Sequence, residues 1–310
     1  MNIIVATDFS EHSIPALKWG AFLSQQLGSD LTVMHVVDMA AGDNTWRILV
    51  ETPEEIEQSA VVEANKKLRD FVGEHCDVDE SEVNFRCCLG TPIDEILAEA
   101  EGKDDPVIVA GTRGASRFKE FVLGNTARRL VRQSDEPVVV VPPEAEVEEP
   151  KDLVVGVDFS DPSREAIRRA AAMARTYGAK LHLVYGYVLP EVATLDGSMG
   201  SISTEIDEVV ANKKQNIQEL VQELGAEDVV EDVDCVHLSP AQAIRQWADE
   251  HDAQWIFMGS HGRRGIKRFF LGNTAERVMR KAPCPIFVVR PGQLDDTREK
   301  LKGGGGEDEA

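Results

Sequence analysis

Two stretches of the chain carry glycines at a spacing that regular secondary structure does not need. The first, GTRGASRFKEFVLGNTA, spans residues 111–127, and the second, GSHGRRGIKRFFLGNTA, spans residues 259–275. In each, two glycines enclose two residues, and a third glycine follows after nine more and precedes Asn-Thr. Glycine permits a positive φ and lets the backbone approach a ligand without a Cβ in the way. The spacing therefore predicts a backbone site for a ligand, present twice.

The third glycine of each stretch immediately precedes a run with helical periodicity. That run starts with Asn125 and Thr126 in the first copy, and with Asn273 and Thr274 in the second. Free N–H groups and the helix dipole at a helix N-terminus attract anions. One helix end stabilises an anion by only about 0.3–1 kcal/mol. Several convergent N–H groups are therefore needed, and two glycine turns that face a helix end would supply them.

A carboxylate follows the first apolar run of each half, in the segments ATDFS and GVDFS. Asp8 and Asp158 would suit the hydroxyl groups of a ribose. The alternative is that each aspartate merely caps the following helix, although nearby serines are also candidates for that cap. Arg113 and His261 occupy equivalent loop positions and could neutralise phosphate charge, and His261 could act as a base. An exposed loop side chain is the favoured interpretation of His261.

The elements that must position these residues alternate along the chain. In the first half, runs of strand length are separated by runs of helical period, and the strand-like runs are NIIVATD, DLTVMHVV, EVNFRCCLG, DPVIVAG and EPVVVVPP. Alternation of this kind predicts an α/β fold with a parallel sheet covered on both faces. We expect a doubly wound, Rossmann-like sheet with strand order 3-2-1-4-5. Such an order would bring Asp8 next to Gly111, and Asp158 next to Gly259.

An internal repeat sets the domain organisation. IIVATDFSEHSIPAL (3–17) matches LVVGVDFSDPSREAI (153–167) at an offset of 150 residues, and the offset becomes 148 from Gly90 onwards. The repeat therefore predicts that the 310 residues form two five-stranded domains. The predicted limits are a first domain at 1–142, an acidic linker at 143–150, a second domain at 151–292, and a flexible acidic tail at 293–310.

Composition excludes several classes of function. A formal net charge of −22 argues against nucleic-acid partners, which need a basic surface. The sequence has no apolar run long enough to span a membrane, and its first residues read as a strand rather than a secretory signal. We therefore expect a cytoplasmic protein without membrane contacts. The five cysteines form no C-x-x-C pair, so no disulfide framework or zinc site is expected, and Cys87, Cys88 and Cys235 are predicted as small buried apolar groups.

The segments ATDFS, GTRG…LGNTA and GSHG…LGNTA resemble the universal stress protein family. The nucleotide-binding pattern of that family is Gly, two residues, Gly, nine residues, Gly, and then Ser or Thr. The resemblance covers nearly all of both halves, and it implies a tandem-domain member that binds ATP, with or without Mg²⁺. One departure concerns the position after the third glycine, where Asn125 and Asn273 stand and the hydroxyl comes one residue later.

The resemblance also implies the residues of each site. In the first half it places Asp8 at the ribose and the backbone of Val36 at the adenine, with further ribose and phosphate contacts from Gly111, Thr112, Arg113, Gly114, Gly124, Asn125 and Thr126. The corresponding residues of the second half are Asp158, Gly186, Gly259, Ser260, His261, Gly262, Gly272, Asn273 and Thr274. No catalytic or metal-ligating residue is assigned.

Three hypotheses about function follow. The favoured one is a nucleotide-dependent regulatory protein of the stress response with slow or no turnover, because the chain lacks a P-loop and a kinase catalytic loop. The second is a scaffold, or a binder of another ligand, with unused pockets. The third is a slow ATPase or a phosphotransfer enzyme. For assembly, the resemblance implies pairing through the last strands, 137–141 and 285–289. The two domains would then form an internal pseudo-dimer related by a pseudo-twofold axis. A homodimer of chains and an unidentified protein partner remain open.

Overall fold

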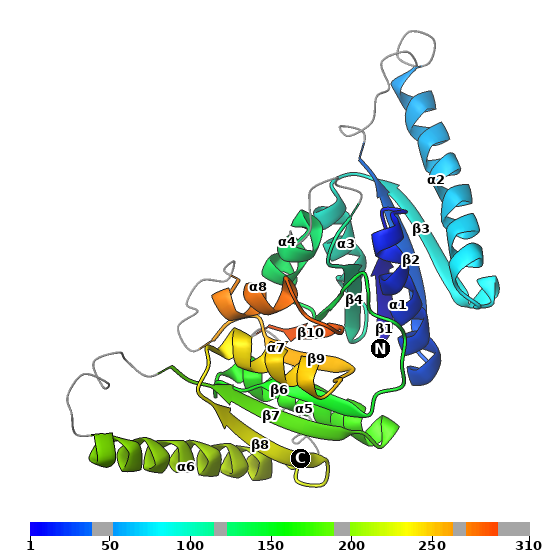
Figure 1. The fold of residues 1–310 in the computed structure, drawn as a ribbon. Coiled ribbons are helices and arrows are strands. Elements are labelled where there is room, and N and C mark those ends of the chain that lie inside the picture. Colours follow the sequence, from blue (N-terminus) through cyan, green and yellow to red (C-terminus); the bar gives the residue numbers. More distant parts are fainter. Residues whose placement is uncertain (39–51, 115–122, 189–198, 263–270, 291–310) are drawn as a thin grey trace, which may run out of the picture. The chain divides into compact units, whose positions relative to one another are not determined.

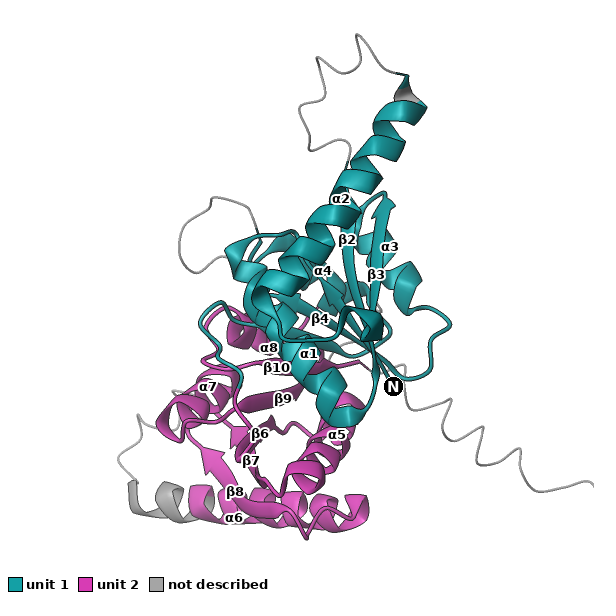
Figure 2. Ribbon diagram, turned by 90° about the vertical axis from the view of Figure 1, so that its right-hand side faces the viewer, with its two compact units in different colours: residues 1–147 teal, residues 148–310 magenta. Residues whose placement is uncertain are grey.

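The computed structural model describes residues 1–38, 52–114, 123–188, 199–262 and 271–290. The chain divides into two compact units, Met1–Val147 and Glu148–Ala310, which Figure 2 shows in different colours. The predicted linker, residues 143–150, contains neither helix nor strand. The predicted tail, 293–310, lies outside the described residues.

Unit 1 alternates strands and helices along its whole length (Figure 1). Its elements are β1 (Asn2–Ala6), the 3-10 turn η1 (Glu11–Ser13), α1 (Ile14–Leu27), β2 (Asp30–Val37), α2 (Pro53–His75), the 3-10 turn η3 (Glu80–Glu82), β3 (Val83–Leu89), α3 (Pro92–Ala100), β4 (Pro106–Gly111), α4 (Asn125–Gln133) and β5 (Val138–Val141). The strands are parallel and lie in the order β3-β2-β1-β4-β5. The predicted fold and strand order are confirmed.

Unit 2 repeats this arrangement. Its elements are β6 (Asp152–Gly156), α5 (Asp161–Tyr177), β7 (Lys180–Gly186), α6 (Met199–Leu224), β8 (Val230–Val236), α7 (Pro240–Glu250), β9 (Trp255–Gly259), α8 (Asn273–Met279) and β10 (Ile286–Val289). The strand order within the unit is β8-β7-β6-β9-β10. All of its strand pairs that the structure describes are parallel.

The handedness of the crossovers places the helices in two layers. In unit 1, α1 and α2 cover one face of the sheet, and α3 and α4 cover the other (Figure 1). The central strand β1 is therefore buried on both sides, and Ile3, Ile4 and Val5 are fully buried. Helix ends follow local rules: Gly28 adopts φ 57° after α1, where a left-handed residue ends the helix, and Gly178 adopts φ 67° after α5.

One expectation about the core is wrong. Cys87, Cys88 and Cys235 are only partly buried. They lie on β3 and β8, the strands at the outer end of the order in each unit, which have a neighbouring strand on one side within that unit. Cys284 is buried instead, and its burial raises the pKa of the thiol. All five cysteines are free thiols.

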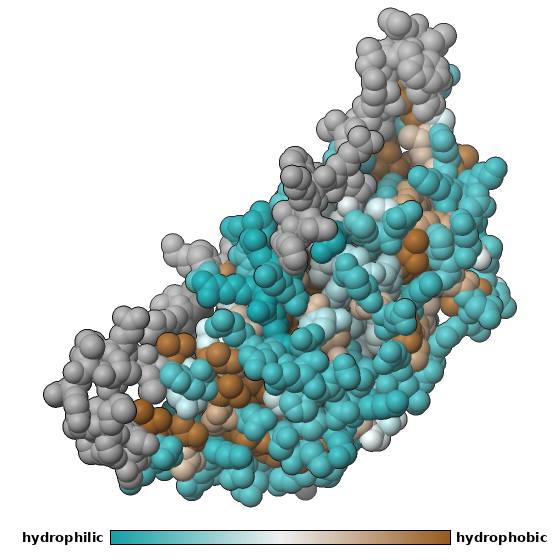
Figure 3. All heavy atoms as spheres, viewed as in Figure 1, coloured by the Kyte–Doolittle hydropathy of each residue, from teal (hydrophilic) through white to brown (hydrophobic). Residues whose placement is uncertain are grey.

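The molecular surface is mostly hydrophilic on the face seen in Figure 3, with separate apolar patches. Among the described residues, Val62 on α2 and Val209 on α6 are large apolar side chains exposed to solvent. Isolated exposed apolar residues of this kind are normal for folded proteins. Within the described ranges, no helix is both long and apolar enough to cross a membrane.

Candidate functional site

The turn after β1 holds the Asp8 carboxylate in a fixed position. Phe9 adopts φ 62°, a left-handed conformation that is unfavourable for a bulky residue, and its N–H donates to Thr7 Oγ1 over 3.0 Å. Asp8 Oδ1 accepts hydrogen bonds from the backbone N–H of Ser10 (3.1 Å) and from its hydroxyl (2.6 Å). Asp8 therefore stabilises its own turn through Oδ1, while Oδ2 faces Gly114. Asp8 thus stabilises a local turn before η1 and is not the residue that caps it, and its role at a ribose stays a prediction.

The three glycines of the first loop lie where a Cβ has little room, and none of them is needed for its backbone conformation. None of Gly111, Gly114 and Gly124 adopts a positive φ, so that reason for glycine is wrong here. A Cβ on Gly111 would lie 2.8 Å from the carbonyl oxygen of His12, and one on Gly114 would lie 2.5 Å from Asp8 Oδ2. A Cβ on Gly124 would lie 3.1 Å from the carbonyl oxygen of Thr112. The glycines thus permit β4, the Asp8 turn and α4 to approach one another closely.

Thr112 connects these elements through its backbone. Its N–H donates to the carbonyl of Val141 on β5 over 2.8 Å, and its carbonyl accepts from Gly124 N–H over 2.7 Å. These two bonds hold the start of α4 against the end of β4. Thr112 is itself buried and is absent from the cavity wall. The role that is visible for Thr112 is therefore that of its backbone, and the nucleotide contact that the resemblance implies for it stays a prediction.

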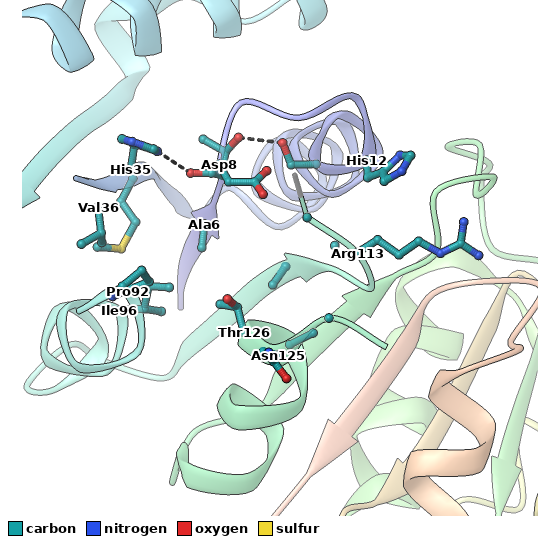
Figure 4. Close-up of a pocket in the computed structure, with 18 of the residues that line it drawn as sticks. Ala6, Asp8, His12, His35, Val36, Pro92, Ile96, Arg113, Asn125 and Thr126 are labelled. Carbon is teal, nitrogen blue, oxygen red and sulfur yellow. Dashed lines mark hydrogen bonds between the residues drawn. The ribbon is translucent and has the colours of Figure 1, made fainter. Parts of the chain in front are cut away.

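A cavity of about 720 Å³ opens at the carboxyl ends of the unit 1 strands (Figure 4). Every predicted site residue of unit 1 except Thr112 lines it: Asp8, Val36, Gly111, Arg113, Gly114, Gly124, Asn125 and Thr126. The strand order explains this convergence, because β1 and β4 are neighbours and their ends meet at the point where the order reverses.

The cavity also has an apolar lining that the glycine pattern did not reveal, and its part around Val36, Pro92 and Ile96 is called the apolar wall below. The apolar residues of the lining are Ala6, Met34, Val36, Pro92, Ile96, Ala110, Leu123 and Ala127. Figure 4 shows Val36, Pro92 and Ile96 close together, on the opposite side from His12 and Arg113. The sequence signal for this wall is the i, i+4 pair Pro92 and Ile96 at the start of α3, which only the fold assigns to the cavity.

Residues of the first turn of α4 line the same cavity. Gly124 is the residue before the helix and has no side chain that could cap it. The helix begins at Asn125. The first intrahelical bond is donated by Arg128 N–H to the carbonyl of Gly124 over 3.1 Å. The preceding N–H groups of Asn125, Thr126 and Ala127 therefore have no partner within the helix, which is the usual geometry of an anion site.

Besides the Asp8 carboxylate, two side chains of the lining, Arg113 and His35, bear on the charge around the cavity. Arg113 is half-buried, and its guanidinium lies 3.8 Å from Glu144 Oε1, a loose ion pair that leaves the cation at the cavity rim. His35 Nδ1 lies 2.8 Å from the carbonyl oxygen of Thr7 and its ring stacks on Phe9 at 4.0 Å. Burial and the nearby Lys67 lower the pKa of His35, although the Thr7 carbonyl and Asp8 oppose the shift. Because a carbonyl only accepts, Nδ1 carries the hydrogen.

Unit 2 repeats the polar part of this site. Phe159 adopts φ 64°, and Asp158 Oδ1 accepts from the N–H (3.0 Å) and hydroxyl (2.5 Å) of Ser160. A Cβ on Gly262 would lie 2.6 Å from Asp158 Oδ2, as in unit 1. Of the other predicted residues, Gly186 ends β7, Gly259 ends β9, Gly272 precedes α8, and Asn273 and Thr274 begin that helix.

Ser260 and His261, the two loop side chains between Gly259 and Gly262, are buried. The prediction that His261 is an exposed loop side chain is therefore wrong. His261 is 7% exposed, and Ser260 is fully buried. The Ser260 hydroxyl bonds His261 Nδ1 over 2.8 Å, which holds the ring inside the protein. Burial and the nearby Arg290 lower the pKa of this imidazole. Among the residues that the structure describes, none forms a hydrogen bond with the buried His261 Nε2. The position that carries a cation in unit 1 therefore carries a neutral ring in unit 2.

Comparison with known proteins extends over both units. The sequence pattern of the universal stress protein family matches residues 1–142 and 150–290. A universal stress protein of Mycolicibacterium smegmatis is 28% identical over 302 residues, covering 94% of this chain and 97% of that protein. One of Mycobacterium tuberculosis is 29% identical over 301 residues, covering 93% and 97%. The crystal structure of a universal stress protein from Archaeoglobus fulgidus is similar in fold, with a TM-score of 0.60 at 22% identity, over 94% of this chain and 97% of that one.

Proposed function

Because this chain belongs to the universal stress protein family, we propose that it is a stress-response regulator that binds an adenine nucleotide, ATP with or without Mg²⁺, in the cavity of unit 1. The observation that carries the proposal is the convergence of the Asp8 carboxylate, the glycine loop and the start of α4 on one cavity with an apolar opposite wall. Its volume of about 720 Å³ lies in the range of small-molecule sites, roughly 300–1,000 Å³.

Each part of a nucleotide has a chemical counterpart in this cavity. The apolar wall around Val36, Pro92 and Ile96 suits a flat purine ring, whose faces gain from leaving water. Asp8 Oδ2 offers an acceptor for ribose hydroxyl groups. The N–H groups at the start of α4, together with the Arg113 cation, suit the phosphates.

A moderate affinity is sufficient for such a regulator. At millimolar ATP, a micromolar site, equivalent to about −8 kcal/mol, is nearly always occupied. The bound form would then be the resting form, and exchange of one nucleotide for another would carry the signal. Binding in this mode needs no catalytic base, so the protein would act through a surface that responds to the bound nucleotide.

The first experiment identifies and counts the nucleotide released when the purified protein is denatured. ATP with Mg²⁺ is then titrated into nucleotide-free protein by calorimetry, and phosphate release is followed in the same samples. We expect bound adenine nucleotide and little release of phosphate. Steady hydrolysis that disappears in Asp8→Ala would favour an enzyme instead. Protein that is empty and that fails to bind added ATP would contradict the proposal.

A matched variant separates the loss of the site from the loss of a turn. Asp79 Oδ1 accepts from Ser81 N–H (2.9 Å) and Ser81 hydroxyl (2.7 Å), the same local pattern that Asp8 makes with Ser10. Asp79 lies before η3 and away from the cavity wall. Asp8→Ala should therefore abolish ATP binding, whereas Asp79→Ala should bind as the wild type does. Equal binding by both variants would exclude the proposed role of Asp8.

A further inference from the structure

The sequence repeat predicts two equivalent nucleotide sites, but the strand ends that would hold the base differ. Val36, at the end of β2, lines the unit 1 cavity, and its counterpart in unit 2 is Gly186 at the end of β7. A Cβ on Gly186 would lie 2.6 Å from Cα and 2.9 Å from N of Pro240, the first residue of α7. Cβ atoms in proteins essentially never approach other atoms that closely, so only glycine fits there.

The contact between Gly186 and Pro240 shows that the start of α7 lies close to strand β7. Val36 carries a Cβ and two methyl groups where Gly186 has none, so Pro92, the counterpart of Pro240, must stand farther from its strand. The backbone at the start of α7 therefore lies closer to β7 than the start of α3 lies to β2. It occupies space that in unit 1 belongs to the apolar wall.

A second pair of residues reports the same difference on the neighbouring strand. Ala6 of β1 and Ile96 of α3 both line the unit 1 cavity. Their counterparts are Gly156 of β6 and Ile244 of α7, and the Ile244 side chain fills the position that a Cβ on residue 156 would take. Helix α7 thus packs closely against two adjacent strands, at a position in each strand that carries glycine.

We propose that only unit 1 binds the adenine base, so that each chain holds one adenine nucleotide, and that Gly156 and Gly186 make this difference by letting α7 close the base end of unit 2. The inference rests on the proposed function. The polar half of the unit 2 site is intact, with Asp158 beside Gly262, so the sequence motif alone cannot distinguish the two sites.

The neutral His261 ring also disfavours nucleotide binding in unit 2, at the end of the site that would hold the phosphates. In unit 1 the equivalent Arg113 is a permanent cation on the cavity wall. His261 points its Nδ1 at the Ser260 hydroxyl over 2.8 Å and is held inside the protein. A polyphosphate therefore meets a cation at this loop position in unit 1 and none at the same position in unit 2.

Calorimetric titration of the full chain with MgATP tests the inference through its stoichiometry. We expect about one site per chain. Asp8→Ala should remove that site, whereas Asp158→Ala, which breaks the same turn in unit 2, should keep it with a Kd changed less than about twofold. A photoreactive azido-adenine analogue should label peptides of unit 1 only. Thermal melting of each variant shows whether it is folded.

Three results would overturn the inference: two sites per chain, label in unit 2 peptides, or loss of binding in Asp158→Ala with Asp8→Ala unaffected. These differ from a failure of the proposed function, in which the wild-type protein binds no nucleotide at all. A reverse variant adds an independent check. Val36→Gly removes the side chain that lines the base end of unit 1, and it should raise the Kd for ATP about tenfold or more while stoichiometry at saturation stays at one.

Discussion

The Oδ2 oxygen of Asp8 lies 2.5 Å from the position that a Cβ on Gly114 would occupy. The two residues are far apart in sequence, and the pairing of β1 with β4 brings them together. The carboxylate is held from its other side, because Oδ1 accepts two hydrogen bonds from Ser10. The absence of one methyl group at residue 114 therefore decides where the second carboxylate oxygen can lie.

Gly114→Ala should impair binding without unfolding the protein. The added Cβ meets the end of a side chain, so the Asp8 carboxylate shifts and the backbone stays in place. We expect the Kd for ATP to rise about tenfold or more, which corresponds to about 1.4 kcal/mol, with an almost unchanged melting temperature. Calorimetry and thermal melting measure the two quantities. Gly73→Ala is the control, since a Cβ there has nothing within 4 Å. Unaltered ATP affinity in Gly114→Ala would show that the Asp8 position does not matter.

Gly111→Ala should have the opposite profile and destabilise the fold. Its Cβ would lie 2.8 Å from the backbone carbonyl of His12, which cannot rotate away. Forcing an extra carbon into a packed site typically costs about 1–3 kcal/mol. Urea denaturation should therefore show a lower free energy of unfolding for Gly111→Ala than for Gly114→Ala. Equal free energies of unfolding for the two variants would mean that the backbone turn carrying His12 can shift at little energetic cost.

His182→Ala should destabilise unit 2, where His182 connects two carboxylates. Its Nδ1 lies 2.8 Å from Asp232 Oδ1 and its Nε2 lies 2.9 Å from Asp152 Oδ1, and the ring is 6% exposed. Removing the imidazole leaves the Asp152 and Asp232 carboxylates without the group between them. We expect the free energy of unfolding to fall by about 1–3 kcal/mol. Partial exposure of both aspartates keeps the loss at the lower end.

The second carboxylate provides the control for this prediction. Adding Asp232→Asn to His182→Ala should recover part of the loss in urea denaturation, because one negative charge then remains. Unit 1 already holds a neutral version of the cluster, in which Asn84 Nδ2 donates to Thr32 Oγ1 over 3.4 Å. If the double variant is less stable than His182→Ala, repulsion between the carboxylates is not the cause of the loss.

His261 should make stability depend on pH in the acidic range. Burial and Arg290 lower the pKa of His261 from its usual 6.5. The unfolded chain therefore binds this proton more readily than the native protein does, and stability falls as the pH decreases below about 6.5. Above that pH the ring is neutral in both states and makes no difference.

The variant His261→Asn isolates this contribution from that of the many carboxylates. Asparagine keeps a polar atom near the Nδ1 position, and it does not titrate. Urea denaturation between pH 7.5 and pH 5 should show a smaller loss of stability for His261→Asn than for the wild type. If the free energy of unfolding falls equally with pH in both proteins, the His261 imidazole binds a proton equally well in the folded and the unfolded chain.

The strand and helix pattern could be predicted because it is local. Apolar runs such as NIIVATD and VVVV need only a sheet buried on both faces, and the glycines after α1 and α5 end those helices by their own left-handed conformation. The repeat then assigned the same strand order to both halves, and the order brought Asp8 to the glycine loop. Of the two reasons predicted for the glycines, the positive φ is wrong, since none occurs at Gly111, Gly114 or Gly124, whereas a lack of room for a Cβ is found at all three.

The sequence alone therefore determined the family, the alternation of elements and the polar half of each site, because short motifs and periodicities encode them. Tertiary structure decided the rest: the apolar wall of unit 1, the burial of His261, and the approach of α7 to Gly186. Those features depend on how closely a helix packs against a sheet. That distance is set jointly by side chains from separate segments, and a single missing Cβ can shift it by about the size of an atom.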